Sequence, residues 1–185
     1  TASSLVAVGY AALGSNTTGA GNVAVGTNAL LDSTTGGNNT AVGNNSLSNN
    51  ITGADNTVMG FEGMKASTTG ADNTSVGYQS LYDNSTGSFN ASFGHRALFN
   101  NTTASNNTAV GTSALFANTT GTDNAVLGSG ALKTNTTGAN NTAIGRAAMQ
   151  ENTTASNNTA VGYAALIANT TGAANTAVGS LALDA

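Results

Sequence analysis

Apolar and polar positions follow one 17-residue pattern that is repeated along the whole chain. Each copy carries a glycine preceded by an apolar residue, from Val8 to Val178, and followed four residues later by Leu or Met, from Leu13 to Leu183. The repeated glycines are Gly9, Gly26, Gly43, Gly60, Gly77, Gly94, Gly111, Gly128, Gly145, Gly162 and Gly179. Because eleven copies fit without insertion or deletion, we interpret residues 1–185 as a single tandem-repeat array.

The consensus N-T-A-V-G-x-x-A-L-x-x-N-T-T-G-A-x favours strands over helices. A two-helix repeat needs about 33 residues or more, and a Gly or Asn every few residues disfavours helix. The short Thr- and Val-rich segments between glycines are typical of strands. We therefore predict an all-β fold, a parallel β-solenoid (β-roll) of eleven 17-residue coils. Coils stacked about 4.8 Å apart would give a rod of about 50 Å.

Two apolar columns are expected to fill the core: the residue before each glycine and the Leu or Met four residues after it. Residues one, two, five and six positions after the glycine vary freely, which indicates solvent exposure. The glycine itself suits a corner that needs positive φ. With so few large side chains per coil, the array is expected to be oligomeric or filament-forming. Neither end shows a recognisable polar cap, so we expect either caps outside this sequence or coils that stack end to end.

One column of asparagines predicts a structural ladder along the rod. Four residues before the glycine, Asn occupies all ten complete copies: Asn22, Asn39, Asn56, Asn73, Asn90, Asn107, Asn124, Asn141, Asn158 and Asn175. In stacked coils each side-chain amide can donate to the carbonyl oxygen of the neighbouring Asn, and it can also satisfy backbone groups at the corner.

Composition excludes several classes of function. Asn, Thr and Gly make up 81 of the 185 residues, only 6% are charged, and there is no Cys. No disulfide framework or cysteine zinc site can form. A net charge of −4 offers no basic surface that would bind nucleic acid. No apolar run approaches the ~18 residues of a membrane span. With a lone His95 in a variable column and no recurring nucleophile, we predict no enzyme activity and no cofactor.

A calcium site is compatible with three acids that share one column, Asp55, Asp72 and Asp123. The nonapeptide pattern G-G-x-G-x-D of calcium-binding β-rolls is absent, however, so we predict no metal site.

Aromatic residues cluster in the middle of the chain and form a candidate contact surface made of Tyr78, Tyr82, Phe99 and Phe116. The last three share one variable column on successive coils. Such a strip can contact sugars or a partner chain. The alternative is local variation in packing.

A rank of threonines raises ice binding as a second class of function. Nine residues after the glycine stand Thr18, Thr35, Thr52, Thr69, Thr86, Thr103, Thr120, Thr137, Thr154 and Thr171. An ice site needs two outward ranks on one face, and the Thr of N-T-A-V supplies the second only if both segments share a sheet. The alternative is that Thr hydroxyls cap backbone at the T-T-G corner.

Asn-x-Ser/Thr triplets are abundant. Examples begin at Asn16, Asn118, Asn135, Asn152 and Asn169. In a eukaryotic secretory setting such triplets are acceptors for N-linked glycans. In any other setting these asparagines serve only the structure of the solenoid.

The segments T-G-A-G-N-V-A-V-G (18–26), T-G-A-N-N-T-A-I-G (137–145) and T-G-A-A-N-T-A-V-G (171–179) resemble the head repeats of trimeric autotransporter adhesins (YadA-like repeats). Similar repeats occur in long bacterial surface proteins and phage tail fibres. The resemblance implies left-handed parallel β-rolls packed about a threefold axis. It also implies that Val25, Ile144 and Val178 point inward, and that Gly26, Gly145 and Gly179 lie at corners. This repeat is about three residues longer than the family's, with the excess in the A-L-x-x-N-T-T half.

We therefore expect a structural protein at the cell surface or outside the cell: the shaft or head of a fibre or adhesin. Its expected partner is itself, as a homotrimer or an end-to-end filament, with host surfaces or glycans as further partners. The alternatives are an ice-binding solenoid and a segment of a phage tail fibre.

Overall fold

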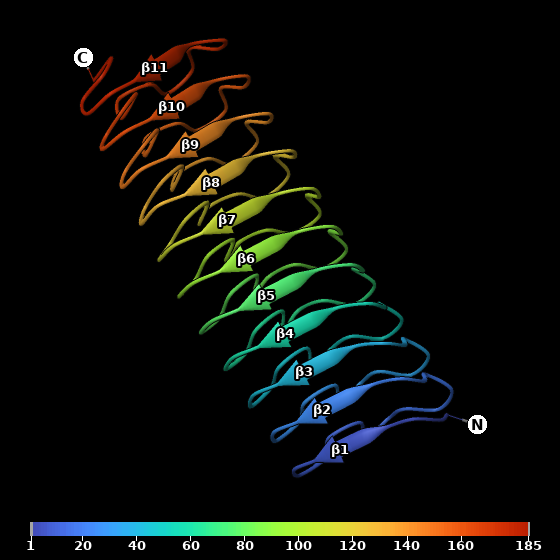
Figure 1. The fold of residues 1–185 in the computed structure, drawn as a ribbon. Coiled ribbons are helices and arrows are strands. Elements are labelled where there is room, and N and C mark those ends of the chain that lie inside the picture. The colour runs from blue at the N-terminus through green and yellow to red at the C-terminus, as the bar shows by residue number, and fades with distance from the viewer. Residues whose placement is uncertain (1, 185) are drawn as a thin grey trace.

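The computed structural model describes residues 2–184, which wind into a rod of stacked coils with one short strand per coil (Figure 1). The strands are β1 (Val6–Val8), β2 (Val23–Val25), β3 (Thr40–Val42), β4 (Thr57–Met59), β5 (Thr74–Val76), β6 (Ala91–Phe93), β7 (Thr108–Val110), β8 (Ala125–Leu127), β9 (Thr142–Ile144), β10 (Thr159–Val161) and β11 (Thr176–Val178). No helix is present in this part of the chain.

The eleven strands form one parallel sheet in sequence order, β1 to β11. Every strand pairs with the next at the same 17-residue shift, as Ala91 pairs with Thr108 and Thr108 with Ala125. The predicted all-β parallel solenoid is thus confirmed, and the strands bound ten complete 17-residue turns.

Hydrogen bonds between coils continue outside the short strands. The Leu115 N–H donates to the Ala131 carbonyl at 3.0 Å, and the Thr119 N–H donates to the Thr136 carbonyl at 2.9 Å. At the corner before the strand, the Asn106 N–H donates to the Ser88 carbonyl at 3.1 Å. Each coil is therefore bound to its neighbours on several sides, although only three of its residues have regular strand geometry.

The core consists of one large column and several columns of small residues. The Leu or Met four residues after the glycine is fully buried in the inner coils. These residues are Leu30, Leu47, Met64, Leu81, Leu98, Leu115, Leu132 and Met149. Around them pack the small residue just before, such as Ala114, and the middle residue of the strand, such as Ala109.

The second predicted core column points outward, so that prediction was wrong. Val178 is 70% exposed, Ile144 is 40% exposed and Val25 is only half-buried. The reason is the alternation of side chains along a strand. The middle residue, such as Ala24, points inward at 0% exposure, so both of its neighbours must point outward. Of the positions drawn from the adhesin resemblance, only the glycine corners match.

Three positions of the repeat adopt the left-handed backbone conformation, and in most coils none of the three is glycine; Gly21 and Gly130 are the exceptions. In one coil these are Ser113 (φ 54°), Leu115 (φ 51°) and Asp123 (φ 59°). Such values are uncommon for residues with a side chain. They break the strict alternation of directions, which lets the consecutive residues Ala114 and Leu115 both be buried.

The repeated glycine is needed both for its backbone angle and for close contact between coils. Gly111 has φ +133°, and a Cβ built on it would lie 2.7 Å from both C and O of Gly128 in the next coil. Real Cβ atoms do not come so close to a neighbouring backbone. The prediction that these glycines form corners with positive φ is confirmed.

We predict that Gly111→Ala lowers the free energy of unfolding by about 3–5 kcal/mol, because it combines backbone strain with a clash against backbone atoms. Gly130→Ala is the matched control: its φ is +65°, an added Cβ would meet only the Gln150 side chain at 3.8 Å, and the same column holds Ala147 and Ala164. The control should change stability by less than about 1 kcal/mol. Urea denaturation followed by circular dichroism measures both, and equal effects would contradict the explanation.

Candidate functional site

The predicted asparagine ladder is present inside the rod. The Asn124 backbone N–H and its side-chain Nδ2 both donate to Asn107 Oδ1, at 3.0 and 3.1 Å. The same Nδ2 donates to the Gly138 carbonyl at 3.0 Å. Each side chain thus ties its own coil together and links it to the preceding coil. The column is buried from Asn22 to Asn158.

A second asparagine ladder lies seven residues after the glycine, and sequence reasoning missed it. Asn118 Nδ2 donates to Asn101 Oδ1 at 3.0 Å and to the Gly121 carbonyl at 2.9 Å. The available signal was Asn in eight of ten copies of this column. In the sequence, Asn118, Asn135 and Asn152 stand out only as starts of Asn-x-Thr triplets. Their side chains are fully buried, so the folded rod does not present them for glycan attachment.

Two serines interrupt this second ladder. Where Ser33 and Ser67 replace Asn, four buried side-chain atoms have no hydrogen-bond partner within residues 2–184. They are Ser33 Oγ, Ser67 Oγ and the Oδ1 atoms of Asn16 and Asn50 in the preceding coils. A serine is too short to span the gap that an asparagine amide bridges elsewhere in the column.

We predict that Ser33→Asn and Ser67→Asn each stabilise the protein by about 1 kcal/mol, because the new amide reaches the unpaired oxygen and closes the ladder. Ser33→Ala should be nearly neutral, since its hydroxyl makes no bond. Asn118→Ser should be destabilising because it opens an intact ladder. Denaturant midpoints of the four variants check this, and a destabilising Ser33→Asn would show that the site has no room for the longer side chain.

The rank of threonines nine residues after the glycine is exposed in every copy, from Thr18 to Thr171. It lies in a bend, whereas the Thr of N-T-A-V lies on the strand. The two Thr ranks therefore do not share a sheet. The hydroxyls that bond to backbone belong to the preceding column, as Thr119 Oγ1 donates to the Thr136 carbonyl at 3.0 Å.

The candidate contact surface divides into two aromatic stacks. The rings of Tyr82, Phe99 and Phe116 stack along the rod, with centroids 5.1 and 5.3 Å apart and planes within 10° of parallel. Both faces of the middle ring are therefore covered by other rings. What a partner meets here is mainly ring edges.

Tyr78 belongs to the second stack, in another column. It lies between Phe61 and His95, at centroid distances of 5.4 and 5.1 Å. The Arg96 guanidinium lies 5.9 Å from the Tyr78 centroid and 5.4 Å from the Phe99 centroid, which joins the two stacks. Sequence reasoning did not find the role of His95 or Arg96, because ring stacking depends on the spacing of coils and on side-chain direction.

A polar chain runs beside the stacks. Arg96 Nε donates to Gln79 Oε1 at 3.0 Å, and Gln79 Nε2 donates to Glu62 Oε2 at 2.9 Å. Lys65 Nζ lies 2.7 Å from Glu62 Oε1. The hydrogen bond from Lys65, followed by that from Gln79, lowers the pKa of Glu62, and the bond to Glu62 raises the pKa of Lys65. Aromatic and charged side chains thus form one connected patch on the middle coils.

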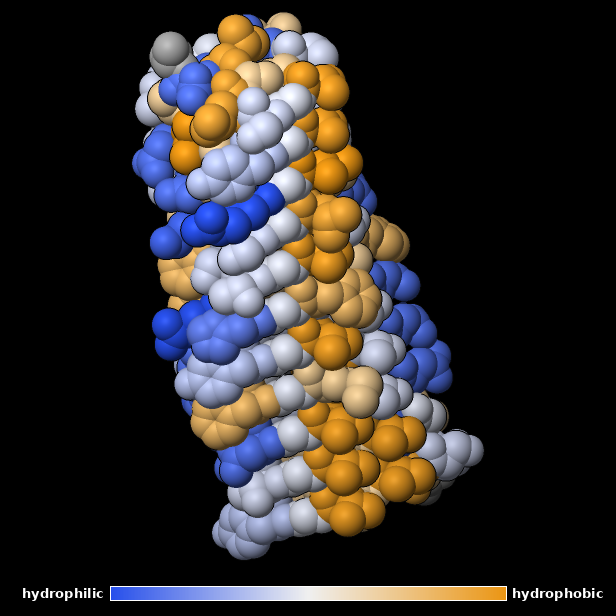
Figure 2. Space-filling model, turned by 60° about the vertical axis from the view of Figure 1, so that its left-hand side comes forward, coloured by the Kyte–Doolittle hydropathy of each residue, from blue (hydrophilic) through white to orange (hydrophobic). Residues whose placement is uncertain are grey.

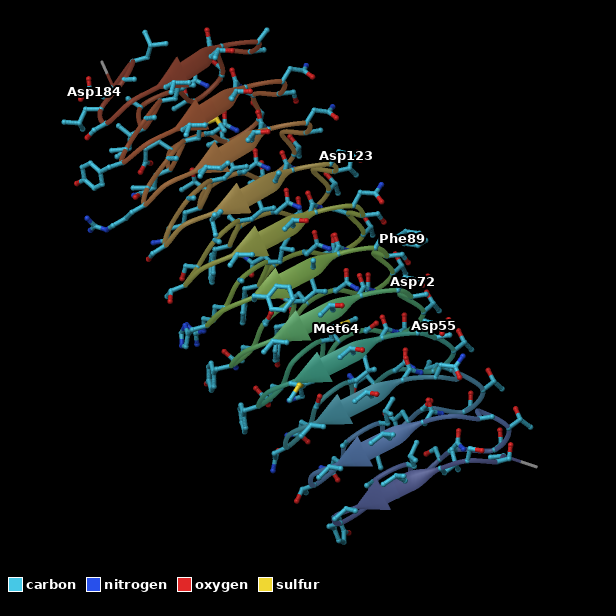
Figure 3. The ribbon with its side chains drawn as sticks, viewed as in Figure 1. Asp55, Met64, Asp72, Phe89, Asp123 and Asp184 are labelled. Atoms are coloured by element: carbon cyan, nitrogen blue, oxygen red, sulfur yellow. The ribbon has the colours of Figure 1, made fainter. Side chains whose placement is uncertain are left out.

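The acids that share a column project from the corner before the strand. Asp55, Asp72 and Asp123 are exposed there and point away from the rod (Figure 3). Asp55 Oδ1 accepts a hydrogen bond from Asn38 Nδ2 at 3.1 Å. Residues 2–184 contain no group of three His, Asp or Glu side chains that could hold a metal ion.

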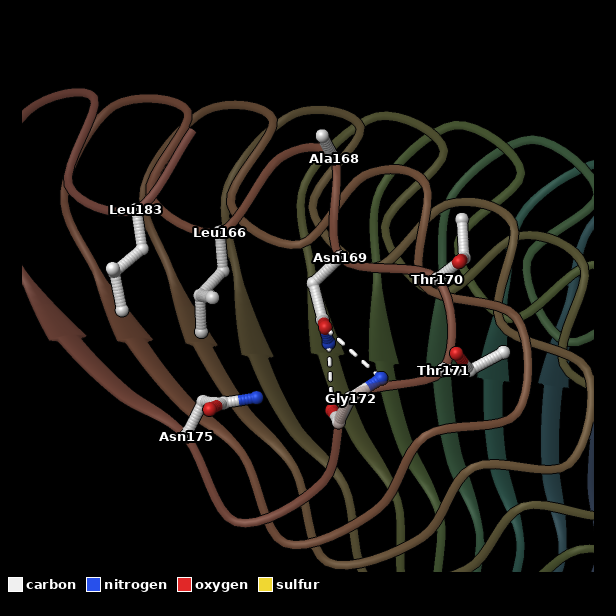
Figure 4. Close-up of a pocket in the computed structure, with 8 residues that line it drawn as sticks. All are labelled: Leu166, Ala168, Asn169, Thr170, Thr171, Gly172, Asn175 and Leu183. Atoms are coloured by element: carbon white, nitrogen blue, oxygen red, sulfur yellow. Dashed lines mark hydrogen bonds between the residues drawn. The ribbon is translucent and has the colours of Figure 1, made fainter. Parts of the chain in front are cut away.

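A cavity of about 310 Å³ opens at the last coils, lined among others by Leu166, Asn169, Thr171 and Leu183 (Figure 4). Asn169 Nδ2 donates to the Gly172 carbonyl at 2.9 Å, as its equivalents do throughout the ladder. In inner repeats the next coil covers these columns, and Asn152 is accordingly fully buried. The cavity is therefore an uncovered stretch of the repeat itself.

An apolar band follows the outer side of the strands along the rod (Figure 2). This band is the column of residues one position before each glycine. We call it, together with the parallel column three positions before each glycine, the sheet face; the second column is Thr in seven of the eleven coils. Of the two columns, the one just before each glycine is apolar in all eleven coils. Leu127, which belongs to it, is 51% exposed. All twelve charged residues of the chain lie in other columns.

No family model, curated protein or solved structure matches this chain. Residues 2–184 contain no helix long and apolar enough to cross a membrane.

Proposed function

We propose that this chain is a structural rod, the shaft or head of an extracellular fibre or adhesin, which associates with copies of itself. The observation that supports this most is the unbroken register from β1 to β11, in which every strand pair has the same 17-residue shift. Such an array is quasi-one-dimensional, so its length follows directly from the number of repeats.

The division between ladder columns and variable columns also supports a display function. The ladders use inward asparagines and backbone groups, and they are independent of the residues one and five positions after the glycine. Those two outer columns hold the two aromatic stacks. A rod built in this way can change its contact chemistry without changing its fold. We propose that the aromatic patch on the middle coils contacts a host surface or a glycan through ring edges and Arg96.

We predict that deleting two whole repeats, residues 94–127, leaves a folded rod about 10 Å shorter, because each coil adds about 4.8 Å. Deleting residues 94–119 is the control, since it removes a length that is not a whole number of repeats and joins unlike columns. Small-angle X-ray scattering gives the maximum dimension, and circular dichroism gives the fold. A shaft function is contradicted if the whole-repeat deletion unfolds or keeps its length.

Ice binding is the alternative, with the exposed Thr rank as its support. We predict no thermal hysteresis, because the neighbouring outward Thr hydroxyls are bonded to backbone and the strand Thr rank is interrupted by Ala91 and Ala125. Nanolitre osmometry tests this. Hysteresis that disappears in Thr120→Val and Thr137→Val variants would overturn the prediction and favour the ice-binding interpretation.

A further inference from the structure

We propose that the sheet face is where two copies of this chain associate, parallel and in register, about a two-fold axis along the rod. The inference rests on the self-association proposed above and names its surface. It starts from a contrast between outward columns. Some outward columns change residue type from coil to coil, as the column of Tyr78, His95 and Thr112 does. The column that includes Thr120 is constant but polar. The column just before the glycine stays apolar through all eleven coils, although within residues 2–184 its side chains are exposed or only half-buried.

The absence of charge favours a second copy as the occupant. In a parallel, in-register pair each coil lies opposite the same coil of its partner, so a charge on the face would be buried in the interface close to the like charge of the other copy. The chain has twelve charged residues and none of them lies on the sheet face. The charges stand instead on the variable columns and on the corner before the strand, as at Lys133, Arg146 and Asp123.

Side-chain sizes on the face complement each other under this symmetry. A two-fold axis along the rod reverses the strand direction, so the residue before the glycine faces the residue three before it in the partner. Phe93 then lies against Ala91 of the other copy, and Leu127 against Ala125. These two alanines are the only ones in their column.

The same compensation marks close packing inside the rod. Val58 replaces the usual Ala or Ser of the inward strand column, and Gly63 stands across from it. A Cβ on Gly63 would lie 2.7 Å from Val58 Cγ1. A paired change of size therefore occurs at this point of contact between two columns, whereas Val126, the other valine of the inward column, has Ala131 at the equivalent position.

The area is sufficient for a stable pair. Eleven strands at about 4.8 Å give a face about 50 Å long, and two outward ranks make it about 12 Å wide. That is about 600 Å² on each copy, or about 1,200 Å² in total, at the lower limit of specific interfaces. One flat face, made of an apolar rank beside a rank that is mostly Thr, forms a closed two-fold contact, whereas a threefold bundle needs each copy to offer two contact surfaces.

The first experiment measures mass in solution by light scattering. The unaltered chain should have twice the 17.9 kDa of one chain. Val110→Asp, which buries one charge from each copy on the same coil near the middle of the interface, should give the mass of one chain. Thr120→Asp is the matched control, since it adds the same charge to an exposed position in the same coil. Circular dichroism must show that both variants keep the fold.

A second experiment determines the register by disulfide formation. Because the chain has no Cys, only the introduced cysteines can form a disulfide. An oxidised mixture of Thr108→Cys and Val110→Cys chains should form a covalent heterodimer. Val110→Cys mixed with Val76→Cys is the control, because those positions meet only if the rods run antiparallel. Cross-linking of the control pair alone would overturn the parallel arrangement.

The outcomes separate this inference from the proposed function. A monomeric wild-type chain contradicts self-association altogether. An oligomer that survives Val110→Asp but dissociates in Phe99→Asp leaves self-association standing and moves the interface to the aromatic column. A mass of three chains overturns the two-fold axis.

Discussion

The hydrogen bonding of each coil to the next at a fixed 17-residue shift is the constraint on which the structure depends. Backbone groups form these bonds in the strand, around Leu115 and at the corner. The asparagine ladders extend them inside the rod, where most Oδ1 atoms of the first ladder, such as that of Asn107, accept from two donors of the following coil. Because the amide has both a donor and an acceptor, one residue type repeats without leaving a buried polar group unpaired. The exceptions occur at Ser33 and Ser67, where the amide is missing.

This repeated bonding also explains how the chain holds an unusual backbone. A left-handed residue with a side chain costs about 1–2 kcal/mol, and most coils contain three of them. They persist because every coil is held between two others that have the same conformation. Leucine is therefore tolerated at φ 51°, as in Leu115. At Gly111 a side chain is excluded for a different reason, because an added Cβ would collide with the backbone of the neighbouring coil.

The sequence was sufficient for features that depend on period and residue type. The 17-residue repeat, the parallel solenoid, the ladder through Asn124 and the corner at Gly111 all follow from them. The direction of Val25 did not, because size alone favours valine over alanine as the core residue, yet Ala24 is the residue that points inward. The stacking of Tyr78 on His95 also could not be derived, since it requires the coil spacing and the side-chain rotamers together.

The sheet face differs from the kinds of column that the fold explains. Inward columns vary only within the space that their neighbours in the core leave, as Gly63 opposite Val58 illustrates. Other outward columns vary or stay polar, because they meet solvent. The column from Val8 to Val178 is outward and yet uniformly apolar. Folding of one chain does not require this, since a polar residue there would disturb neither the ladders nor the core. This contrast is what supports the proposed association of two copies through the sheet face.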